Sequence, residues 1–582
     1  MRTPFSTLIV FVFACLSVSS RSASTDYPVN VDDLDPLKEC KRREVKLAQS
    51  DNKVYMYGGQ SWVKNGTEKP FQITNHYLRI ADFTSARNLS DRSILSAKDI
   101  PGNITIFQNG AFWADSRKVY VAGGDVNDEP WLSRQGQFLP SNFTYVGGTI
   151  FSYDLDADEW TSEPGVQPNS GFRVNDTFCC GSFAYNAGYG KAYFYSGNNG
   201  AGARKLYPDT VPGYVGRPDE EVIGNGNLLT FDPGSFRWSN VTTDEPLTTI
   251  GTENGQFVFL PGTTSPSGGI GILLGGMHRE TKDMESMRKV LVYDSGTDSW
   301  YGQATTVEGD PPSGRWRFCA VAASAPDNSS HNIYIYAGES PNAQPDAYSD
   351  MWILSIPSFH WIHIDVYSPP RKALGCTTVA ERYMVTYGGI KLGWDKEGDE
   401  DECDQENYGL RLFDLSNLAW TSWYEGPSAT NAFTVPKLVY DVIGGNEQGG
   451  ATQTTPKEGF ETAGLTSLFQ RSSPTIMYST TSSLPTNTAI TSKTSTNTGA
   501  IAGGVAGGVV GLTLVITGCL CFMKRRIPRL VDAFKISAPS GPNEVEGQPT
   551  PCEVEGQSKF PPVVSAPYEV DGQSRYPREL AG

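Results

Sequence analysis

An apolar or aromatic residue followed seven positions later by tryptophan recurs along the chain, and this repeat constrains the fold more than any other feature. The pairs are Tyr153 and Trp160, Phe231 and Trp238, Tyr293 and Trp300, Leu354 and Trp361, and Phe413 and Trp420. Each pair follows a short hydrophobic run that ends in two small residues, at 119–124, 192–197, 271–276, 333–338 and 384–389. A further run at 54–59 has the first half of the pattern without the tryptophan. The chain therefore repeats a unit of about 50–80 residues that contains a strand, a small-residue turn and a second strand.

A repeat of this kind predicts an all-β fold, the β-propeller. A four-stranded sheet cannot bury both faces alone, so such sheets stack radially and each forms a wall of its neighbour's core. The paired small residues end the second strand, where the backbone needs a conformation that a Cβ atom would disfavour. The aromatic rings fill the gaps between sheets and bury about 150–250 Å² each. The repeated tryptophans are therefore packing residues and not part of an active site.

The repeat resembles the kelch repeat, and the resemblance covers roughly residues 40–445. It implies a kelch β-propeller over residues 25–445. Six units with a strand and a small-residue pair are visible, which predicts six blades, and the extra pair Gly444-Gly445 leaves seven blades as an alternative. Proline near the start of segment 435–443 and glycine at its end predict a short helix. On that interpretation, residues 431–435 form the last strand and close the ring.

The two ends of the chain predict a single-pass type I membrane protein. Arg2, an apolar stretch at 8–18 and small residues through 24 have the layout of a secretory signal peptide, residues 1–24. Residues 499–523 carry no charge, and at about 1.5 Å per residue they exceed the roughly 30 Å of bilayer hydrocarbon. Basic residues from Lys524 to Arg529 place the tail, residues 524–582, in the cytoplasm. The propeller is then outside, at the plasma membrane or within the secretory pathway.

The segment between propeller and membrane, residues 446–498, is predicted to be an extended stalk. More than half of residues 466–498 are serine or threonine, a composition that cannot build a core and suits O-glycosylation. The order of signal, propeller, stalk, span and tail resembles kelch-repeat membrane proteins of filamentous fungi. N-glycosylation sequons agree with this topology because all lie on the predicted outer side, at Asn65, Asn88, Asn103, Asn142, Asn175, Asn240 and Asn328.

Two features outside the propeller indicate partners. Gly503, Gly507 and Gly511 lie four residues apart and would give the span a flat face for a helix–helix dimer; the alternative is that these glycines merely face lipid. A short phrase occurs three times in the proline-rich tail, at 544–548, 553–557 and 569–573. Repeated weak motifs in an extended chain suit a multivalent cytosolic partner, whereas low-complexity drift would give the same pattern without one.

Charge and cysteine content bound the function further. The net charge of −17 argues against nucleic acid, which needs a basic surface. An even number of cysteines on the outer side permits up to three disulfides, and buried thiols are the alternative. The cysteines concerned are Cys40, Cys179, Cys180, Cys319, Cys376 and Cys403.

The sequence gives no catalytic, metal or cofactor site. Copper oxidases of the galactose oxidase type are also secreted kelch propellers, but their copper needs converging histidines and tyrosines. His360 and His363 lie three apart in a predicted strand and so point to opposite faces. The acidic run 395–406 lacks the alternation of an EF-hand loop, so a solvated loop is favoured over a calcium site.

A binding face is the remaining candidate. Propellers usually bind ligands at the mouths of the central channel, and four arginines precede inner strands: Arg173, Arg315, Arg317 and Arg371. Resemblance to kelch domains that hold acidic peptides implies the same role here, while pairing with the chain's own carboxylates is the alternative. We expect recognition of an extracellular protein, glycan or small molecule. The alternatives are a secretory-pathway enzyme or tailoring accessory that acts on a small metabolite in the channel, and a wall-associated structural anchor.

Overall fold

The computed structural model describes residues 35, 37, 39–64, 70–75, 77–101, 104, 106–124, 148–168, 178–199, 227–242, 252–263, 268–278, 281–341, 347–391 and 403–472. The predicted signal peptide, membrane span and cytoplasmic tail lie outside these residues. Within the described part, no helix combines the length and the apolar character that a membrane crossing requires.

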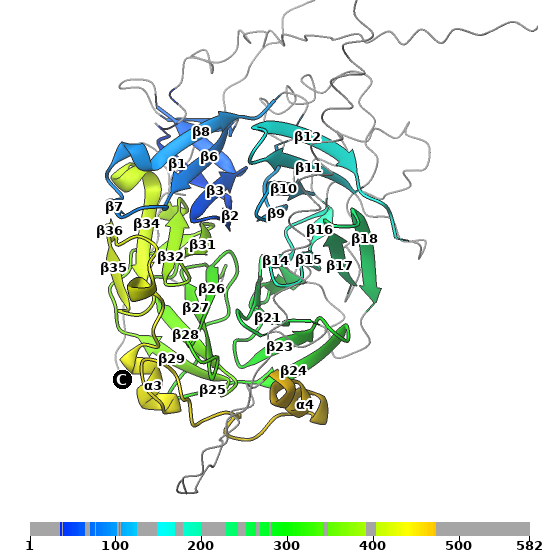
Figure 1. Ribbon diagram of the computed structural model, residues 1–582, viewed down its shortest axis with the longest axis vertical. Helices are drawn as coiled ribbons and strands as arrows, with labels where there is room; N and C mark the ends of the chain where they lie inside the picture. Colours follow the sequence, from blue (N-terminus) through cyan, green and yellow to red (C-terminus); the bar gives the residue numbers. More distant parts are fainter. Residues whose placement is uncertain are drawn as a thin grey trace, which may run out of the picture. The chain divides into compact units, whose positions relative to one another are not determined.

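The described strands form six antiparallel sheets, or blades, arranged in a ring (Figure 1). Each blade is a continuous stretch of chain whose strands run in order from the innermost to the outermost. Blades 1 to 3 consist of β2 (Lys46–Ser50), β3 (Lys53–Tyr57), β6 (Tyr77–Asp82) and β8 (Leu95–Asp99); β9 (Ala111–Ala114), β10 (Lys118–Ala122), β11 (Thr149–Asp154) and β12 (Glu159–Pro164); and β14 (Ser182–Asn186), β15 (Lys191–Tyr195), β17 (Asn227–Asp232) and β18 (Arg237–Thr242). The predicted six blades are confirmed.

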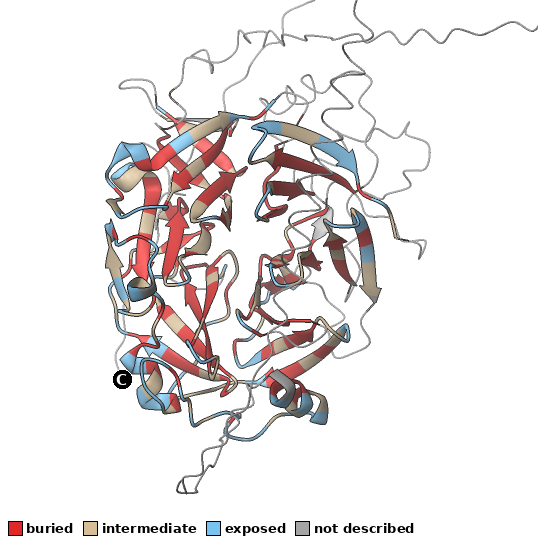
Figure 2. Ribbon diagram, viewed as in Figure 1, coloured by how far each residue is buried: buried red, intermediate tan, exposed pale blue. Residues whose placement is uncertain are grey.

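Blades 4 to 6 repeat this arrangement. They consist of β20 (Gln256–Phe259), β21 (Ile270–Leu274), β23 (Lys289–Asp294) and β24 (Ser299–Ala304); β26 (Cys319–Ser324), β27 (His331–Tyr336), β28 (Met351–Ile356) and β29 (His360–Ile364), with β25 (Thr306–Val307) added at the rim; and β31 (Gly375–Val379), β32 (Tyr383–Tyr387), β34 (Leu410–Asp414) and β35 (Ala419–Thr421). The middle strands of the blades are mostly buried, whereas an outer strand such as β12 faces solvent (Figure 2).

Short strand pairs lie next to the inner strands and join the segments that precede and follow the first hairpin of a blade. They are β1 (Lys41–Arg43) with β4 (Gln60–Val63), which also pairs with β5 (Phe71–Thr74); β13 (Phe178–Cys179) with β16 (Asn198–Asn199); β19 (Thr252–Glu253) with β22 (Met277–His278); and β30 (Arg371–Lys372) with β33 (Ile390–Lys391).

The repeated spacing of seven residues reflects how the third and fourth strands of each blade pair. Every one of the five pairs, from Tyr153 and Trp160 to Phe413 and Trp420, lies directly opposite across the third and fourth strands of its blade. The indole of Trp238 donates to the carbonyl oxygen of Gly148 at 2.8 Å, and that of Trp361 donates to Met287 at 2.9 Å. Both acceptors belong to the preceding blade, so the predicted role of these rings between blades is confirmed.

Blade 1 has no tryptophan of this kind, and another ring fills its boundary with blade 6. Tyr424 in β36 (Trp423–Tyr424) is fully buried there and meets Phe83 edge-on, with ring centroids 5.1 Å apart. β36 also pairs with β7 (Arg87–Asn88). The segment after blade 6 therefore contributes both an aromatic ring and a strand to the contact with blade 1. The sequence pattern is therefore incomplete in the first unit, while the packing is complete.

The glycine pairs end the second strands because the chain turns there against the next blade. Gly123 has a φ of 63°, and a Cβ atom placed on it would lie 2.6 Å from the ring of Phe178. Gly190 has nearly the same φ of 61° but no heavy atom within 4 Å of a built Cβ. A comparison of the two positions therefore distinguishes the cost of the left-handed backbone, which both share, from the cost of the close contact between blades, which only Gly123 has.

We expect Gly190→Ala to lower the free energy of unfolding by about 1–2 kcal/mol, the usual cost of a side chain in the left-handed conformation. Gly123→Ala should lower it by about 2–5 kcal/mol, because overpacking against Phe178 adds to the same conformational cost. Urea unfolding of both variants measures the difference. Equal losses would mean that the approach of blade 3 to Gly123 contributes nothing.

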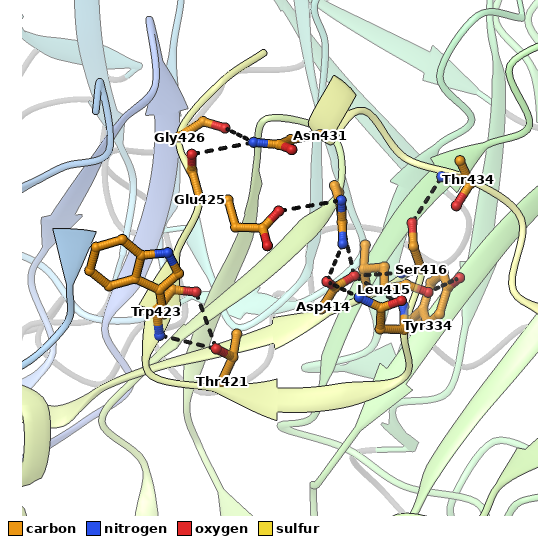
Figure 3. A network of polar contacts seen from close by, with 12 residues as sticks. Tyr334, Asp414, Leu415, Ser416, Thr421, Trp423, Glu425, Gly426, Asn431 and Thr434 are labelled. Carbon is orange, nitrogen blue, oxygen red and sulfur yellow. Dashed lines mark hydrogen bonds and ion pairs between the residues drawn. The ribbon is translucent and has the colours of Figure 1, made fainter. Parts of the chain in front are cut away.

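The prediction that residues 431–435 form a closing strand is wrong. Figure 3 shows Asn431 donating to the carbonyl oxygens of Glu425 and Gly426, both at 3.3 Å, while the Thr434 amide donates to Ser416 Oγ at 2.8 Å. Phe433 and Val435 are buried in the core shared by blades 5 and 6. The segment is not a strand because its apolar side chains enter that core, while its polar groups form hydrogen bonds with residues of blade 6 and the loop that follows it. Blade 6 already has four strands without it.

In the described part of the chain, two α-helices follow the last blade. The predicted short helix is present as α3 (Lys437–Ile443), with Val439 and Ile443 on its buried side. A second helix, α4 (Ala463–Ser472), lies within the segment assigned from sequence to the stalk. Its Leu465, Leu468 and Phe469 are buried against blades 4 and 5. Packing on the propeller therefore continues through residues 463–469.

Candidate binding site at the channel mouth

The inner strands of all six blades enclose a central cavity of about 570 Å³. Its wall has an aromatic side with the half-buried Phe183 and Tyr185 of blade 3, and a polar end with Glu44 and Arg317. Cavities that bind small molecules are mostly apolar with a few placed polar groups, and their volumes fall in this range. The channel is therefore the strongest candidate binding site in the described part of the chain.

A ring of six residues surrounds one mouth of this channel, and we call it the mouth ring. Each member lies two positions before the inner strand of its blade and has a left-handed backbone, with φ between 50° and 64°. The members are Glu44, Asn109, Cys180, Asn254, Arg317 and Ala373.

Backbone hydrogen bonds connect the mouth ring from blade to blade. The amides of Glu44, Ala373, Arg317, Asn254 and Cys180 donate in turn to the carbonyl oxygens of Ala373, Arg317, Asn254, Cys180 and Asn109, over 2.6–3.0 Å. The left-handed conformation aims each amide at the neighbouring blade, so the ring is built by the main chain. Its side chains are not needed for these bonds.

Arg317 is the predicted arginine that the structure places on the mouth ring and in the cavity wall. Its guanidinium lies 3.1 Å from Glu44 and 3.3 Å from Glu339, and 29% of its side chain stays exposed. Burial opposes its charge, but the carboxylates of Glu44 and Glu339 outweigh this effect and raise the pKa of Arg317. Lys372 reaches the other oxygen of Glu339 at 3.1 Å. This cluster holds Arg317 as a charged, partly accessible donor.

Lys46 is a second cation in the cavity wall and lies two residues after Glu44, at the start of β2. Desolvation in the cavity lowers the pKa of Lys46, while Cys180 and Glu44 act in the opposite direction. The charged residues of the cavity wall are therefore Lys46 and Arg317 beside Glu44, while the buried Lys372 pairs with Glu339 outside the wall. An acidic group that enters the channel would meet an excess of positive charge.

Arg315 and Arg371 are buried side chains that already bind carboxylates of the chain. Arg315 holds Asp350 with two hydrogen bonds of 2.7 Å and has no exposed surface. Arg371 holds Asp404 at 2.6 and 3.0 Å and is 1% exposed. These two arginines fix loops between blades and are not presented to the channel. Arg173 lies outside the described residues.

The cysteines form two disulfides in the described chain. Cys40–Cys403 joins the segment before blade 1 to the loop of blade 6, and Cys319–Cys376 joins the inner strands β26 and β31. Cys179 ends β13, and Cys180 is a member of the mouth ring. Cys319 and Cys376 thus lie in inner strands, whereas Cys179 and Cys180 precede the inner strand β14.

The remaining sequence candidates that the structure describes are not among the residues that line the channel. In the part of the chain that the structure describes, no group of three or more His, Cys, Asp or Glu side chains is arranged to hold a metal ion. Of the sequons, Asn88 lies in β7, Asn240 in β18 and Asn328 in the hairpin turn between β26 and β27. Asn65, Asn103, Asn142 and Asn175 lie outside the described residues.

Only Arg317 and Cys180 of the mouth ring were predicted site residues; the other four members were not. Its members differ in chemistry, so no residue type marks them. Their shared offset of two residues before each inner strand is a usable signal once the inner strands are known. At Asn109 and Asn254 the residue type is a second signal, because asparagine tolerates the left-handed conformation better than most residues.

The sequence of this chain is similar to that of a fungal protein. A kelch repeat-containing protein of Arthroderma benhamiae is 27% identical over 467 residues, a match that covers 73% of this chain and 66% of that protein. The match thus spans slightly less than two thirds of the relative's length. No protein-family model matches the chain.

Proposed function

We propose that this kelch-repeat propeller, related to a fungal kelch repeat-containing protein, is a recognition module that binds a small polar molecule or peptide with an acidic group in its channel. The observation that carries the proposal is the cavity of about 570 Å³ with Arg317 and Lys46 at its polar end. A guanidinium has five N–H donors, so Arg317 can bind a carboxylate of the ligand in addition to Glu44 and Glu339. The aromatic side of the channel would pack against an apolar portion of the same ligand.

The test uses the full chain in detergent on a glycan array and against a panel of small carboxylic acids. We expect Arg317→Ala to weaken binding of a recovered ligand about ten- to hundredfold, because one charge-assisted pair is lost. Arg288→Ala is the matched control, since Arg288 is exposed on the outside of blade 4 and lies 4.0 Å from Asp310. Equal affinities of the Arg317→Ala variant and the wild type for every recovered ligand would place the binding site elsewhere.

We also propose that the propeller faces the outside of the cell and is anchored by residues 499–523. The signal peptide, the sequons and the basic flank of the span support this topology. Treatment of intact cells with a glycosidase should reduce the mass of the membrane-bound protein. An unchanged mass in a host that glycosylates its secreted proteins would remove the main support.

A further inference from the structure

The sulfur atoms of Cys179 and Cys180 lie 2.6 Å apart. Successive side chains of a strand point to opposite faces, so neighbouring cysteines in extended chain keep their sulfurs apart. Here Cys179 is the last residue of β13 and Cys180 has a φ of 64°, so the chain turns between them. Unbonded carbon atoms already prefer separations of about 3.5–4.0 Å, and sulfur is larger. The two sulfurs are not bonded to each other in this structure, but they lie closer than any non-bonded contact and only about 0.6 Å beyond the length of a disulfide bond.

The backbone conformation that brings the two sulfurs together belongs to the mouth ring and does not depend on the cysteine side chains. The Cys180 amide donates to the carbonyl oxygen of Asn109 at 2.9 Å, and the Cys180 carbonyl oxygen accepts from the Asn254 amide at 2.6 Å. Asn109 and Asn254 have the same left-handed conformation at the same offset from their strands, without a neighbouring cysteine. The backbone that brings the sulfurs together is thus fixed by the propeller.

The other outer-side cysteines are already paired as Cys40–Cys403 and Cys319–Cys376. We propose that Cys179 and Cys180 form a vicinal disulfide at the channel mouth, and that this bond is a redox-sensitive modification site. The inference does not depend on the identity of the channel ligand.

The bond forms by thiol–disulfide exchange with the disulfide of a protein oxidoreductase. One cysteine thiolate attacks a donor sulfur and releases the other donor sulfur as a thiolate, which gives a mixed disulfide. The second cysteine thiolate then attacks the first, and the remaining donor sulfur leaves. The two cysteines lose two protons and two electrons in total, and the oxidoreductase gains them as a dithiol.

Exposure determines the direction of reductive attack. Cys179 is 1% exposed, whereas Cys180 is half-buried beside Gly181, which lines the channel. A small thiol therefore attacks Sγ of Cys180, the more exposed sulfur, and Cys179 leaves as the thiolate. Reduction leaves a vicinal dithiol at the mouth. The chemical class that such a pair binds is a trivalent arsenical, whose arsenic forms a bond to each sulfur as its oxygen leaves as water.

Peptide mapping of the full-length protein tests the bond. The protein is denatured without reductant in iodoacetamide, deglycosylated because Asn175 lies in the same peptide, and cleaved after Arg173 and Lys191. We expect peptide 174–191 to be unlabelled and lighter than its dithiol form by two hydrogen atoms. After reduction it should carry two labels. Two labels without reduction, or a bond from this peptide to another, would overturn the proposal.

A second measurement tests the redox response in the folded protein. Under graded reduction, peptide 174–191 should become labelled before the peptides that contain Cys40, Cys403, Cys319 and Cys376. The partly reduced protein should then bind one phenylarsine oxide per chain, and Cys180→Ser should abolish this binding. Labelling after the other two disulfides, or equal arsenical binding by Cys180→Ser, would contradict the redox role. If Cys180→Ser does not accumulate, the labelling order of the wild type still decides.

Discussion

Asp404→Ala is expected to lower the free energy of unfolding by about 3–5 kcal/mol, because it leaves a buried guanidinium without its neutralising carboxylate. Asp404 is 2% exposed and accepts hydrogen bonds from Arg371 at 2.6 and 3.0 Å and from Arg411 at 3.1 Å. It also supports the charge of the buried Arg42. Without this carboxylate, the positive charges of Arg42, Arg371 and Arg411 at the junction of blades 6 and 1 repel one another with less compensation. Urea unfolding of the wild type and the variant measures the loss.

Asp441→Ala is the matched control. Asp441 pairs with Lys437 one helical turn away on the exposed side of α3, so its loss should cost no more than about 0.5 kcal/mol. The double variant Arg371→Met, Asp404→Ala should recover part of the stability, because no buried charge of that pair remains. A loss for Asp404→Ala that is no larger than that of the control would show that the buried pair is neutral in stability.

The same site gives a pH dependence. Burial alone would raise the pKa of Asp404, but Arg371 and Arg411 outweigh it and lower the pKa below its ordinary value of 3.8. A carboxylate with a lowered folded pKa stabilises the protein above its ordinary pKa, and this contribution is lost as the pH falls through the folded value. The stability difference between the wild type and Asp404→Ala should therefore be constant near neutral pH and shrink in acid.

Removal of the Cys40–Cys403 disulfide is the second change with a large expected effect. The bond joins residues 363 apart and closes the ring between the segment before blade 1 and the loop of blade 6. In the chain-entropy treatment, a loop of that length contributes about 5–6 kcal/mol of stability. Cys40→Ala, Cys403→Ala should lower the thermal midpoint accordingly, and should expose the edge of blade 1 to proteolysis before the middle blades.

The Cys319–Cys376 disulfide supplies the comparison. Its cysteines are 57 residues apart, so the same treatment gives about 4 kcal/mol. Cys319→Ala, Cys376→Ala should therefore be the milder double variant, and its proteolysis should not begin at the junction of blades 1 and 6. A smaller loss for the Cys40–Cys403 variant would indicate that β7, β36 and their packing close the ring without help from the bond.

The blades could be predicted from the sequence because their signals are local. The interval from Tyr153 to Trp160 is the path around one hairpin, so a spacing along the chain becomes a contact across two strands. Gly123 marks a turn for a similar reason, since its conformation and its closeness to the next blade both exclude a side chain. Such features appear as fixed residue types at fixed distances.

The site could be predicted only in part because its partners are distant in sequence. Arg315, Arg317 and Arg371 look alike as residues that precede inner strands. Asp350 and Asp404 remove two of them from the channel, and nothing near the arginines in sequence indicates those pairings. The closing strand was predicted wrongly for a related reason, since Phe433 and Val435 are as apolar as a strand requires and their burial beneath blades 5 and 6 depends on the finished fold.

The mouth ring has a consequence for how the channel could be diversified. Because main-chain atoms make its bonds, the six positions already tolerate a glutamate, two asparagines, a cysteine, an arginine and an alanine. The hydrogen bonds of the ring are thus independent of its side chains: a substitution at Asn109, Asn254 or Ala373, which line the cavity, alters the entrance and keeps the main-chain donors and acceptors. Combinatorial libraries at these three positions, drawn from residues that accept a left-handed backbone, offer a direct way to engineer new ligand preferences into this propeller.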